Sequence, residues 1–536
     1  MTKEEFEAQK LQDEVTSYDR KTKTWSTSLL FKMRPPDLGP NKQKALGILK
    51  KVERSTIQKG VVEEVNKAFA EFVDCGFAEE VFEEVEPEEV HYLPGHAVFR
   101  EDSTSMKTRI VFNASAVSES GRSLNQCLHQ GPCLLPDIGQ ILMRFRLQSV
   151  GFTLDISRMF LRIKLEHGKD FLRFFWRNCD LNAKVRVFQM LSVTFGIISS
   201  PFQAIDVVMK HAELFEKIFP RAVQVIRDQL YMDDVLGGAA DPETARATIE
   251  EIAEFFLEAS MQPHKFASNK PEILECVPGE FRSPEKVHKV LGVLWDTETD
   301  RLLLKIKQFE LSGKWDTKRS FLEFSARIYD PLGLVSPFTT RVKLLFQQVW
   351  LAESEGGKKA KSWDEPLPDL IQEQWDEIKR DVPNLGVLSF PRCPFSSKGP
   401  PKEVEIFAFG DASQKAYGTA IYLVGLHEDG EKTTHLAFAK SRVAPLKMVQ
   451  QSDEPQTIVR LELLAALITA RAASYVRLGI EKHVNVSRVH FFTDSLINLC
   501  RIRRGPTKYK LWVANRIEEI LNLSTCLLYT SPSPRD

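Results

Sequence analysis

The sequence predicts a multidomain protein of mixed α+β and α/β class, and three observations support this prediction. The chain has 536 residues, and domains of roughly 100–200 residues give about three, each large enough to bury its own core. The composition, with 43% hydrophobic, 10% aromatic and 27% charged residues, is ordinary for globular domains and excludes collagen-like, coiled-coil and wholly disordered chains. Short apolar segments typical of strands also end in acidic residues in two separate parts of the chain.

The net charge is −1, from 72 Lys and Arg residues against 73 Asp and Glu residues, so any nucleic-acid affinity must come from local patches. Residues 61–90 hold 11 acidic residues and one basic residue, and this segment should avoid phosphates. Residues 100–200 hold 14 basic and 8 acidic residues. This second region is a candidate phosphate-facing surface, and an ordinary solvated face is the alternative.

Eight cysteines are scattered without a C-x-x-C motif or a zinc-like Cys/His spacing, which predicts a reduced, intracellular protein. The first ten residues lack the apolar core of a signal peptide, and the longest uncharged run, residues 187–205, is interrupted by Gly196 and Pro201. We therefore expect neither secretion by this end nor a membrane span.

Two polar stretches suggest the organisation of the chain. Residues 1–60, with a Pro-Pro pair at 35–36 and a helical stretch at 42–52, are expected to form an arm rather than a domain. The stretch PRCPFSSKGPP at 391–401 breaks the periodicity and is typical of a linker. We place a domain boundary there, ahead of a new run of strands.

A first group of three carboxylates lies on two strand-like segments. Residues 149–156 (SVGFTLDI) predict a buried strand that ends at Asp155, and residues 222–239 predict a strand, a tight turn at YMDD and a second strand. The adjacent Asp233 and Asp234 repel each other unless cations lie between them. Hard Mg²⁺ prefers such oxygens, and a pair of ions roughly 3.5–4 Å apart activates a 3′-hydroxyl and stabilises a leaving pyrophosphate. An exposed turn, with Asp155 as a helix cap, is the alternative.

These segments belong to a longer series of motifs that resembles the reverse transcriptase of the Pao/BEL group of long-terminal-repeat retrotransposons. The matching strings cover about 250 residues and are HYLPGHAVFR (91–100), TRIVFNASA (108–116), SLNQCLHQGP (123–132), FTLDISRMFLRI (152–163), SVTFGIISSPFQA (192–204), YMDDVLGG (231–238), HKFASN (264–269), KVLGVLWD (289–296) and ARIYDPLGLVSP (326–337). The resemblance implies a right-hand fold with fingers, palm and thumb, in which the palm carries Asp155, Asp233 and Asp234.

The resemblance also implies a set of substrate-binding residues, namely Arg109, Phe160, Gly196, Tyr231, Met232 and Lys265. Arg109 matches an arginine that grips the incoming triphosphate through paired hydrogen bonds, and a surface salt bridge is its alternative. Phe160 matches an aromatic residue that blocks a ribose 2′-hydroxyl, unless it is core. Gly196 matches a glycine that lets backbone approach nucleotide and template, or is a turn glycine. Lys265 matches a basic residue near the triphosphate, or is simply solvated.

A second group of acids follows the linker. The predicted elements are strands over 404–409, 418–424, 434–440 and 489–493 and a helix over 460–476, an antiparallel start to a mixed sheet. Asp411 and Asp494 follow strands, and Glu462 lies on the helix. This order resembles ribonuclease H, whose acids bind two Mg²⁺ ions and hydrolyse the RNA of a hybrid. Each acid alone would be a cap or a surface group.

Three strings carry the ribonuclease H resemblance and match its Pao/BEL version: FGDASQKAYGTAIYL (409–423), RLELLAAL (460–467) and FTDSLINL (492–499). The family continues beyond residues 510–520 to a histidine-bearing strand and a fourth acidic residue, which this sequence lacks. Residues 526–536 (CLLYTSPSPRD) instead back-translate to a sequencing-library adapter. We expect these last residues to be an artefact without function, and the incomplete ribonuclease H to cut RNA poorly.

The expected domains are an N-terminal arm (1–60), reverse transcriptase fingers and palm (61–300), a thumb and connection region with a linker (301–400), an incomplete ribonuclease H-like domain (401–525) and the artefact (526–536). The motifs together predict an RNA-directed DNA polymerase with Mg²⁺, or Mn²⁺ in its place, as cofactor. The expected partners are an RNA template, a DNA primer, RNA:DNA hybrids, dNTPs and other pol and gag products of the element, and no membrane. The expected location is the cytoplasm, inside virus-like particles, with a nuclear stage.

Two other functional classes stay open at this point. One is a decayed or domesticated retrotransposon fragment that only binds nucleic acid. The other is an RNA-dependent RNA polymerase, which shares the palm acids. Phe160 and the ribonuclease-like domain argue against this last class.

Overall fold

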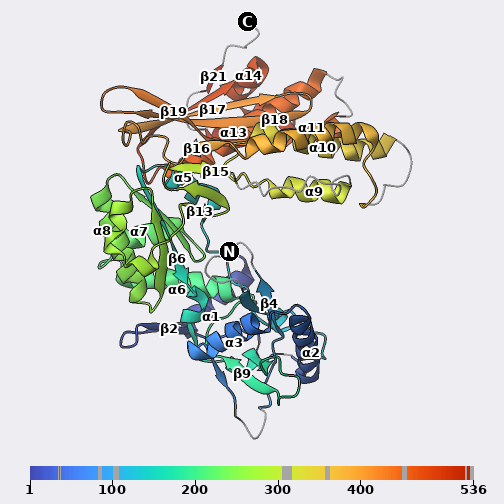
Figure 1. Cartoon of the computed structure of the whole chain (residues 1–536). Coiled ribbons are helices and arrows are strands. Elements are labelled where there is room, and N and C mark those ends of the chain that lie inside the picture. The colour runs from blue at the N-terminus through green and yellow to red at the C-terminus, as the bar shows by residue number, and fades with distance from the viewer. Residues whose placement is uncertain are drawn as a thin grey trace. The chain divides into compact units, whose positions relative to one another are not determined.

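The computed structural model describes residues 1–33, 36, 38–82, 87–99, 108–304, 317–355, 363–449, 455–524 and 528–530 (Figure 1). The chain divides into two compact units. Unit 1 comprises residues 1–135, 154–235 and 248–264, and unit 2 comprises residues 136–153, 236–247 and 265–536.

Unit 1 is built from short helices and small sheets. Its helices are α1 (Lys3–Val15), α2 (Lys42–Gln58), α3 (Val62–Asp74), α4 (Leu124–Cys127), α6 (Ser200–Phe215) and α7 (Pro220–Gln229). Its strands are β1 (Ser17–Asp19), β2 (Thr24–Thr27), β3 (Ala78–Glu80), β4 (Gly95–Phe99), β5 (Thr108–Phe112), β7 (Lys164–Leu165), β8 (Arg173–Trp176), β9 (Arg186–Met190) and β10 (Leu230–Tyr231). The sheets have the orders β1-β2-β7, β3-β9-β8 and β4-β5.

The core of unit 1 is rich in aromatic side chains. Helix α3 buries Val65, Phe69 and Phe72, which lie on one face because they are four and three residues apart. Phe69 stacks on Trp176 of β8, with 3.8 Å between the ring centroids. This packing fixes α3 against the β3-β9-β8 sheet.

Residues 1–60, which were expected to form an arm, are part of unit 1. Trp25 is buried and donates its indole N–H to Nδ1 of His211 at 3.1 Å. The buried Gln12 of α1 accepts hydrogen bonds from Thr27 and Gln203, each at 3.1 Å. The segment therefore completes the core of a folded unit. Pro35, the first residue of its Pro-Pro pair, lies outside the described residues.

The segment before the YMDD turn also differs from the prediction. The strand expected from residue 222 is helix α7, and only the two residues of β10 precede the turn. Pro220 fits the first turn of a helix. Val223 and Ile226 are buried three residues apart, and this helical spacing outweighs the β-branched composition that suggested a strand.

Four elements contribute residues to both units: β6 (Val150–Ser157), β11 (Asp234–Ala239), α8 (Pro242–Leu257) and β12 (Gln262–Ser268). The three strands form a sheet with β10 in the order β10-β11-β6-β12. The first five residues of β6 are all buried. The predicted buried strand that leads to Asp155 is therefore confirmed.

Unit 2 contains a five-stranded sheet, a four-stranded sheet and several long helices. Its helices are α5 (Ile138–Phe145), α9 (Lys318–Arg327), α10 (Ser336–Glu355), α11 (Asp369–Leu385), α12 (Leu446–Val449), α13 (Pro455–Ile480), α14 (Leu496–Arg504) and α15 (Leu511–Leu523). Its strands are β13 (Val287–Val290), β14 (Val293–Asp296), β15 (Arg301–Leu303), β16 (Ser389–Pro391), β17 (Glu403–Ala412), β18 (Ala416–Leu426), β19 (Lys432–Val443), β20 (Val486–Thr493) and β21 (Leu528–Thr530).

The five-stranded sheet has the order β19-β18-β17-β20-β21. Strands β17, β18 and β19 are antiparallel, and β20 is parallel to β17 and to β21. The predicted antiparallel start to a mixed sheet is confirmed. Strand β21 lies within residues 526–536, which were expected to be an artefact without function, and the other residues of that stretch lie outside the described ones.

Helix α13 packs on this sheet. Its segment Thr457–Ile480 is, within the described part of the chain, the one helix long and apolar enough to cross a membrane by length and composition alone. In the structure 61% of its most apolar window is buried. The core helix of a folded domain has the same length, composition and burial.

Helices α9, α10 and α11 share a second core in unit 2, centred on the fully buried Trp375. Phe321 and Phe324 of α9 meet this ring edge-to-face, with centroid distances of 4.5 and 4.7 Å. Aromatic pairs favour this geometry, so the α9–α11 bundle is well specified.

The predicted linker at 391–401 is anchored in the fold by Arg392. This side chain is 0% exposed and its Nε lies 2.6 Å from Oδ1 of Asp300. Its terminal nitrogens donate to the carbonyls of Phe145 and Ser149, each at 2.8 Å. The beginning of the stretch is therefore a fixed junction of unit 2 and not a free linker. The mixed α/β, multidomain class is confirmed, and the fingers, palm and thumb arrangement stays a prediction.

Candidate active sites

The first carboxylate cluster consists of Asp155, Asp233 and Asp234, and backbone pairing positions it. In the β10–β11 hairpin, Tyr231 pairs with Asp234, so that Met232 and Asp233 form the turn. Met232 has a positive φ of 56°, as a turn this tight requires of one of its residues. The backbone N–H of Ile156 donates to the carbonyl of Asp233 at 2.8 Å, which fixes the residue next to Asp155 against the tip of the hairpin.

His264 of β12 is a neighbour of Asp155 that the sequence analysis missed. Its Nδ1 lies 2.9 Å from the backbone oxygen of Asp155 and 3.5 Å from Oδ1. Because a carbonyl only accepts, this bond requires a proton on Nδ1. His264 directly precedes Lys265 in the motif HKFASN, and that position was the signal available in the sequence.

Arg109 and Phe160 lie in unit 1, as the first cluster does. Arg109 is on β5 opposite Val98, and its Nε is buried with no hydrogen-bond partner among the residues that the structure describes. Phe160 is half-buried in the single-turn segment Met159–Arg162 and meets Phe195 edge-to-face, with 5.2 Å between the centroids.

Gly196 has a structural reason for being glycine. Its φ is +98°, and a Cβ atom there would lie 1.9 Å from the backbone oxygen of Phe112. The Asn125 amide donates to the Gly196 carbonyl at 3.0 Å. The loop thus packs on the end of β5, the strand that carries Arg109, and a contact of Gly196 with nucleotide stays a prediction. Lys265 is on β12 with a positive φ of 54°.

The second carboxylate cluster consists of Asp411, Glu462 and Asp494, all in unit 2. Asp411 lies near the end of β17, Glu462 near the start of α13, and Asp494 directly after β20. Ser495 caps α14 by accepting a hydrogen bond from the backbone N–H of Asn498. The Ser495 hydroxyl also donates to Oε2 of Glu462 at 2.5 Å, so side-chain bonds orient this carboxylate.

Electrostatics connects the three acids of the second cluster. Burial raises the pKa of Glu462, and the negative charges of Asp494 and Asp411 raise it further, while the Ser495 hydrogen bond lowers it. The carboxylates therefore repel one another, which a divalent cation between them would relieve. Across the described ranges, no group of three or more His, Cys, Asp or Glu side chains has an arrangement ready to hold a metal ion.

Comparison with solved structures shows which fold the chain resembles. The chain matches a foamy viral protease-reverse transcriptase in complex with double-stranded DNA with a TM-score of 0.56 and 12% identity, covering 99% of this chain and 98% of the other. It matches a dRH form of that protein in complex with DNA with a TM-score of 0.56 and 13% identity, covering 100% of this chain and 83% of the other. The match to the foamy viral protease-reverse transcriptase in complex with RNA/DNA hybrid has a TM-score of 0.52 and 13% identity, and it covers 99% of this chain and 63% of the other. The chain therefore has a reverse transcriptase fold with a ribonuclease H-like domain.

A family match narrows this class. Residues 317–495 match the Pao retrotransposon-like RNaseH-like domain, so the Pao resemblance read from the motifs is confirmed. The match begins well before the boundary placed at 400/401 and includes all three acids of the second cluster. No curated protein sequence matches the chain.

Proposed function

We propose that the chain is the RNA-directed DNA polymerase of a Pao-type retrotransposon, with a linked ribonuclease H. The observation that supports this proposal is the bond from Ile156 to Asp233, which holds the residue after Asp155 against the hairpin that carries Asp233 and Asp234. These residues would hold Mg²⁺, or Mn²⁺ in its place, and the bound ions supply Lewis-acid chemistry for nucleotidyl transfer.

The remaining residues of unit 1 would select and orient the substrate. Arg109, whose Nε has no hydrogen-bond partner in the described part of the chain, offers its guanidinium to the triphosphate of a dNTP. Phe160, supported by Phe195, limits space at the sugar. Tyr231 and Met232 of the hairpin would border the primer end.

Three further proposals concern the residues near the nucleotide, the hydrolysis of the RNA:DNA hybrid, and the location of the protein in the cell. Gly196 and Lys265 would lie near nucleotide and triphosphate, as their motifs imply. Asp411, Glu462 and Asp494 would bind divalent ions and hydrolyse the RNA strand of a hybrid. The RNA template, the DNA primer and their hybrid are the macromolecular partners, along with other pol and gag products. We place the protein in cytoplasmic virus-like particles, with a nuclear stage.

The test is primer extension on poly(rA)/oligo(dT) with dTTP in Mg²⁺ and in Mn²⁺, run beside a gel-shift assay on the same duplex. We expect both binding and extension. Binding without extension in either metal would favour the alternative of a fragment that only binds nucleic acid. Extension that uses UTP as well as dTTP would favour an RNA polymerase.

A further inference from the structure

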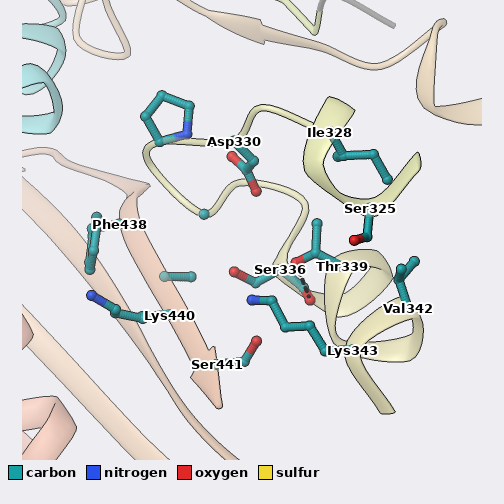
Figure 2. A pocket seen from close by; sticks show the side chains of 13 residues that line it. Ser325, Ile328, Asp330, Ser336, Thr339, Val342, Lys343, Phe438, Lys440 and Ser441 are labelled. Carbon is teal, nitrogen blue, oxygen red and sulfur yellow. Dashed lines mark hydrogen bonds between the residues drawn. The ribbon is translucent and has the colours of Figure 1, made fainter. Parts of the chain in front are cut away.

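A basic cavity of about 370 Å³ lies in unit 2, between the turn before α10, the first turns of α10 and strand β19 (Figure 2). The turn is firmly held. Both carboxylate oxygens of Asp330 accept backbone N–H groups, from Leu334 and Val335, at 2.8 Å. The N–H of Ala439 donates to the carbonyl of Leu332 at 2.9 Å. The cavity is therefore a built feature of the fold.

Positive charge gathers at this cavity. Lys343 of α10 and Lys440 of β19 line it together with the hydroxyls of Ser336 and Ser441, and Figure 2 shows the Lys343 amino group directed between those two serines. Burial lowers the pKa of Lys343, and the nearby charges of Lys440 and Arg442 lower it further, against the effect of Asp330. Cations that repel one another in this way favour a bound anion.

The carboxylate of the cavity, Asp330, offsets only part of this positive charge. Asp330 is committed to the backbone N–H groups of its own turn, and burial raises its pKa. Among the described residues, Lys343, Lys440 and Arg442 have no ion-pair partner.

The Thr340 hydroxyl donates to the Ser336 carbonyl, so the Ser441 hydroxyl donates to Thr340. The amines of the lysines are therefore the main donors that phosphate oxygens would accept at this concave site.

The basic surface continues beyond this cavity. Lys440 and Arg442 also line a second cavity of about 350 Å³, together with Tyr417 and Arg471. Arg471 is paired with Glu519, whereas Lys440 and Arg442 of β19 have no ion-pair partner in the part of the chain that the structure describes.

The carboxylate that lines this second cavity, Asp137, accepts a hydrogen bond from the Tyr475 hydroxyl. Two adjoining cavities joined by Lys440 suit consecutive phosphates better than one small anion.

The sheet register relates this surface to the second carboxylate cluster. Ser441 pairs with Gly418, and Gly418 pairs with Asp411. Two inter-strand steps place the backbones of Ser441 and Asp411 about 10 Å apart. A polynucleotide that reaches Asp411 therefore has other backbone phosphates within reach of β19.

We propose that Lys343, Lys440 and Arg442 bind backbone phosphates of the RNA:DNA hybrid whose RNA strand reaches the second carboxylate cluster. This inference rests on the proposed ribonuclease H function and adds the surface that holds the duplex for it. Such contacts position the nucleic acid and carry no sequence preference.

The test measures binding of the full chain to a fluorescent RNA:DNA hybrid by anisotropy, in EDTA to prevent cleavage, from 50 to 200 mM KCl. The variants are Lys343→Gln, Lys440→Gln and the double variant. The matched control is Lys482→Gln, which removes an exposed lysine just after α13. Thermal unfolding of each protein verifies the fold.

Each lost phosphate contact should make the slope of log affinity against log salt shallower by about 0.9, so the slope of the double variant should be shallower than that of wild type by about 1.8. Its affinity at 50 mM KCl should fall roughly tenfold, while the control behaves as wild type. Inorganic phosphate at constant ionic strength should leave hybrid affinity unchanged.

The outcomes separate this inference from the function on which it rests. Wild-type affinity and slope in the double variant would overturn the inference and leave the ribonuclease H proposal intact. A wild-type chain that does not bind the hybrid would overturn both. Lower affinity with an unchanged slope, or displacement by millimolar inorganic phosphate, would also overturn the assignment to backbone phosphates.

Discussion

The two carboxylate clusters differ in what holds their acids in place. In the first cluster, backbone hydrogen bonds do this, through the hairpin pair of Tyr231 with Asp234 and the bond from Ile156 to Asp233. In the second cluster, the Ser495 side chain bonds directly to the Glu462 carboxylate. The difference teaches that the position of Asp233 depends on backbone pairing, whereas the orientation of the Glu462 carboxylate depends on a neighbouring side chain that a single substitution removes.

The largest expected effect comes from substituting one acid in each cluster, because each substitution should abolish one activity and leave the other intact. Asp233→Asn should lower primer extension about a thousandfold or more, because a lost metal ligand removes several kcal/mol of stabilisation, while binding of template and primer stays near normal. Hybrid cleavage should be unchanged. Asp411→Asn should give the reverse pattern, with cleavage lost and extension retained.

The assays are extension of a labelled primer and cleavage of a labelled hybrid by the same protein preparations. The matched control is Asp180→Asn, which replaces a carboxylate that accepts a local backbone N–H in unit 1. Extension by Asp233→Asn at a tenth of the wild-type rate would contradict the metal-ligand assignment.

A second variant addresses the stability of the unit that holds the second cluster. Arg392→Met removes a 0% exposed cation, the ion-pair partner of Asp300 and a donor to several backbone carbonyls. Asp300 keeps the neutral side-chain donors Trp295 and Asn269. The free energy of unfolding should fall by about 4 kcal/mol, as is usual when one partner of a buried pair is lost. Urea denaturation followed by tryptophan fluorescence measures this change.

The control for this variant is Arg319→Met, because Arg319 and Asp364 form a comparable ion pair with side chains 64% and 65% exposed. Its loss should cost about 1 kcal/mol or less. Equal effects of the two substitutions would mean that Arg392 does not anchor unit 2.

A third test concerns the acid sensitivity of unit 1. Burial lowers the pKa of His211 from 6.5 to about 4. Its Nδ1 accepts from Trp25 and its Nε2–H donates to the carbonyl of Phe255 at 2.8 Å. The unfolded chain therefore binds a proton that the folded chain excludes, so stability should fall as pH drops from 6.5 towards 4, by about 3 kcal/mol in all.

The measurement is unfolding free energy against pH for wild type and His211→Gln, whose amide keeps one acceptor and one donor. The variant should show a shallower loss of stability between pH 6.5 and 4. His96→Gln, at an exposed position on β4, should keep the wild-type slope. Identical slopes in all three proteins would mean that folding does not lower the pKa of His211.

Sequence reasoning recovered most of the elements that carry acids, for a physical reason. A buried central strand is a continuous apolar run, and β6 was recognised from such a run together with Asp155 near its end. In β17 buried positions alternate with more exposed ones, and this strand was recognised together with Asp411 near its end. Helix α7 was missed because Val223 and Ile226 favour strands by composition, and only their buried spacing, visible after folding, indicates a helix. The motifs located both carboxylate clusters, but metal binding itself stays a prediction.

Contacts between residues far apart in the chain could not be predicted from the sequence. Arg392 stands in a Pro- and Ser-rich stretch that is typical of a linker, and its partners Asp300 and Phe145 lie 92 and 247 residues away. Trp25 and His211 are 186 residues apart. No local pattern encodes such pairs, so the anchored junction and the fold of residues 1–60 required the structure.

The fourth prediction concerns sugar choice in unit 1. Phe160→Ala should raise ribonucleotide incorporation relative to deoxynucleotide by roughly ten- to a hundredfold, because removing the ring makes room for a 2′-hydroxyl without touching the acids. Single-nucleotide extension with dTTP and UTP measures the ratio. Phe160→Leu keeps most of the bulk and should change the ratio little, and an unchanged ratio in Phe160→Ala would show that Phe160 is only core.

The smallest effect tests the comparison of the clusters most directly. Ser495→Ala removes the hydroxyl that bonds to Glu462 and caps α14. Hybrid cleavage should fall roughly fivefold, near 1 kcal/mol, which is typical of one lost hydrogen bond, while primer extension stays at the wild-type rate.

The pH profile identifies the cause of this loss. The Ser495 hydrogen bond lowers the pKa of Glu462, so its removal lets that pKa rise, and the acidic limb of the cleavage profile should move to higher pH. Ser495→Thr keeps the hydroxyl and should restore both rate and profile. If Ser495→Ala slows extension as much as cleavage, or leaves the acidic limb in place, then orientation of Glu462 by a side chain does not distinguish the second cluster from the first.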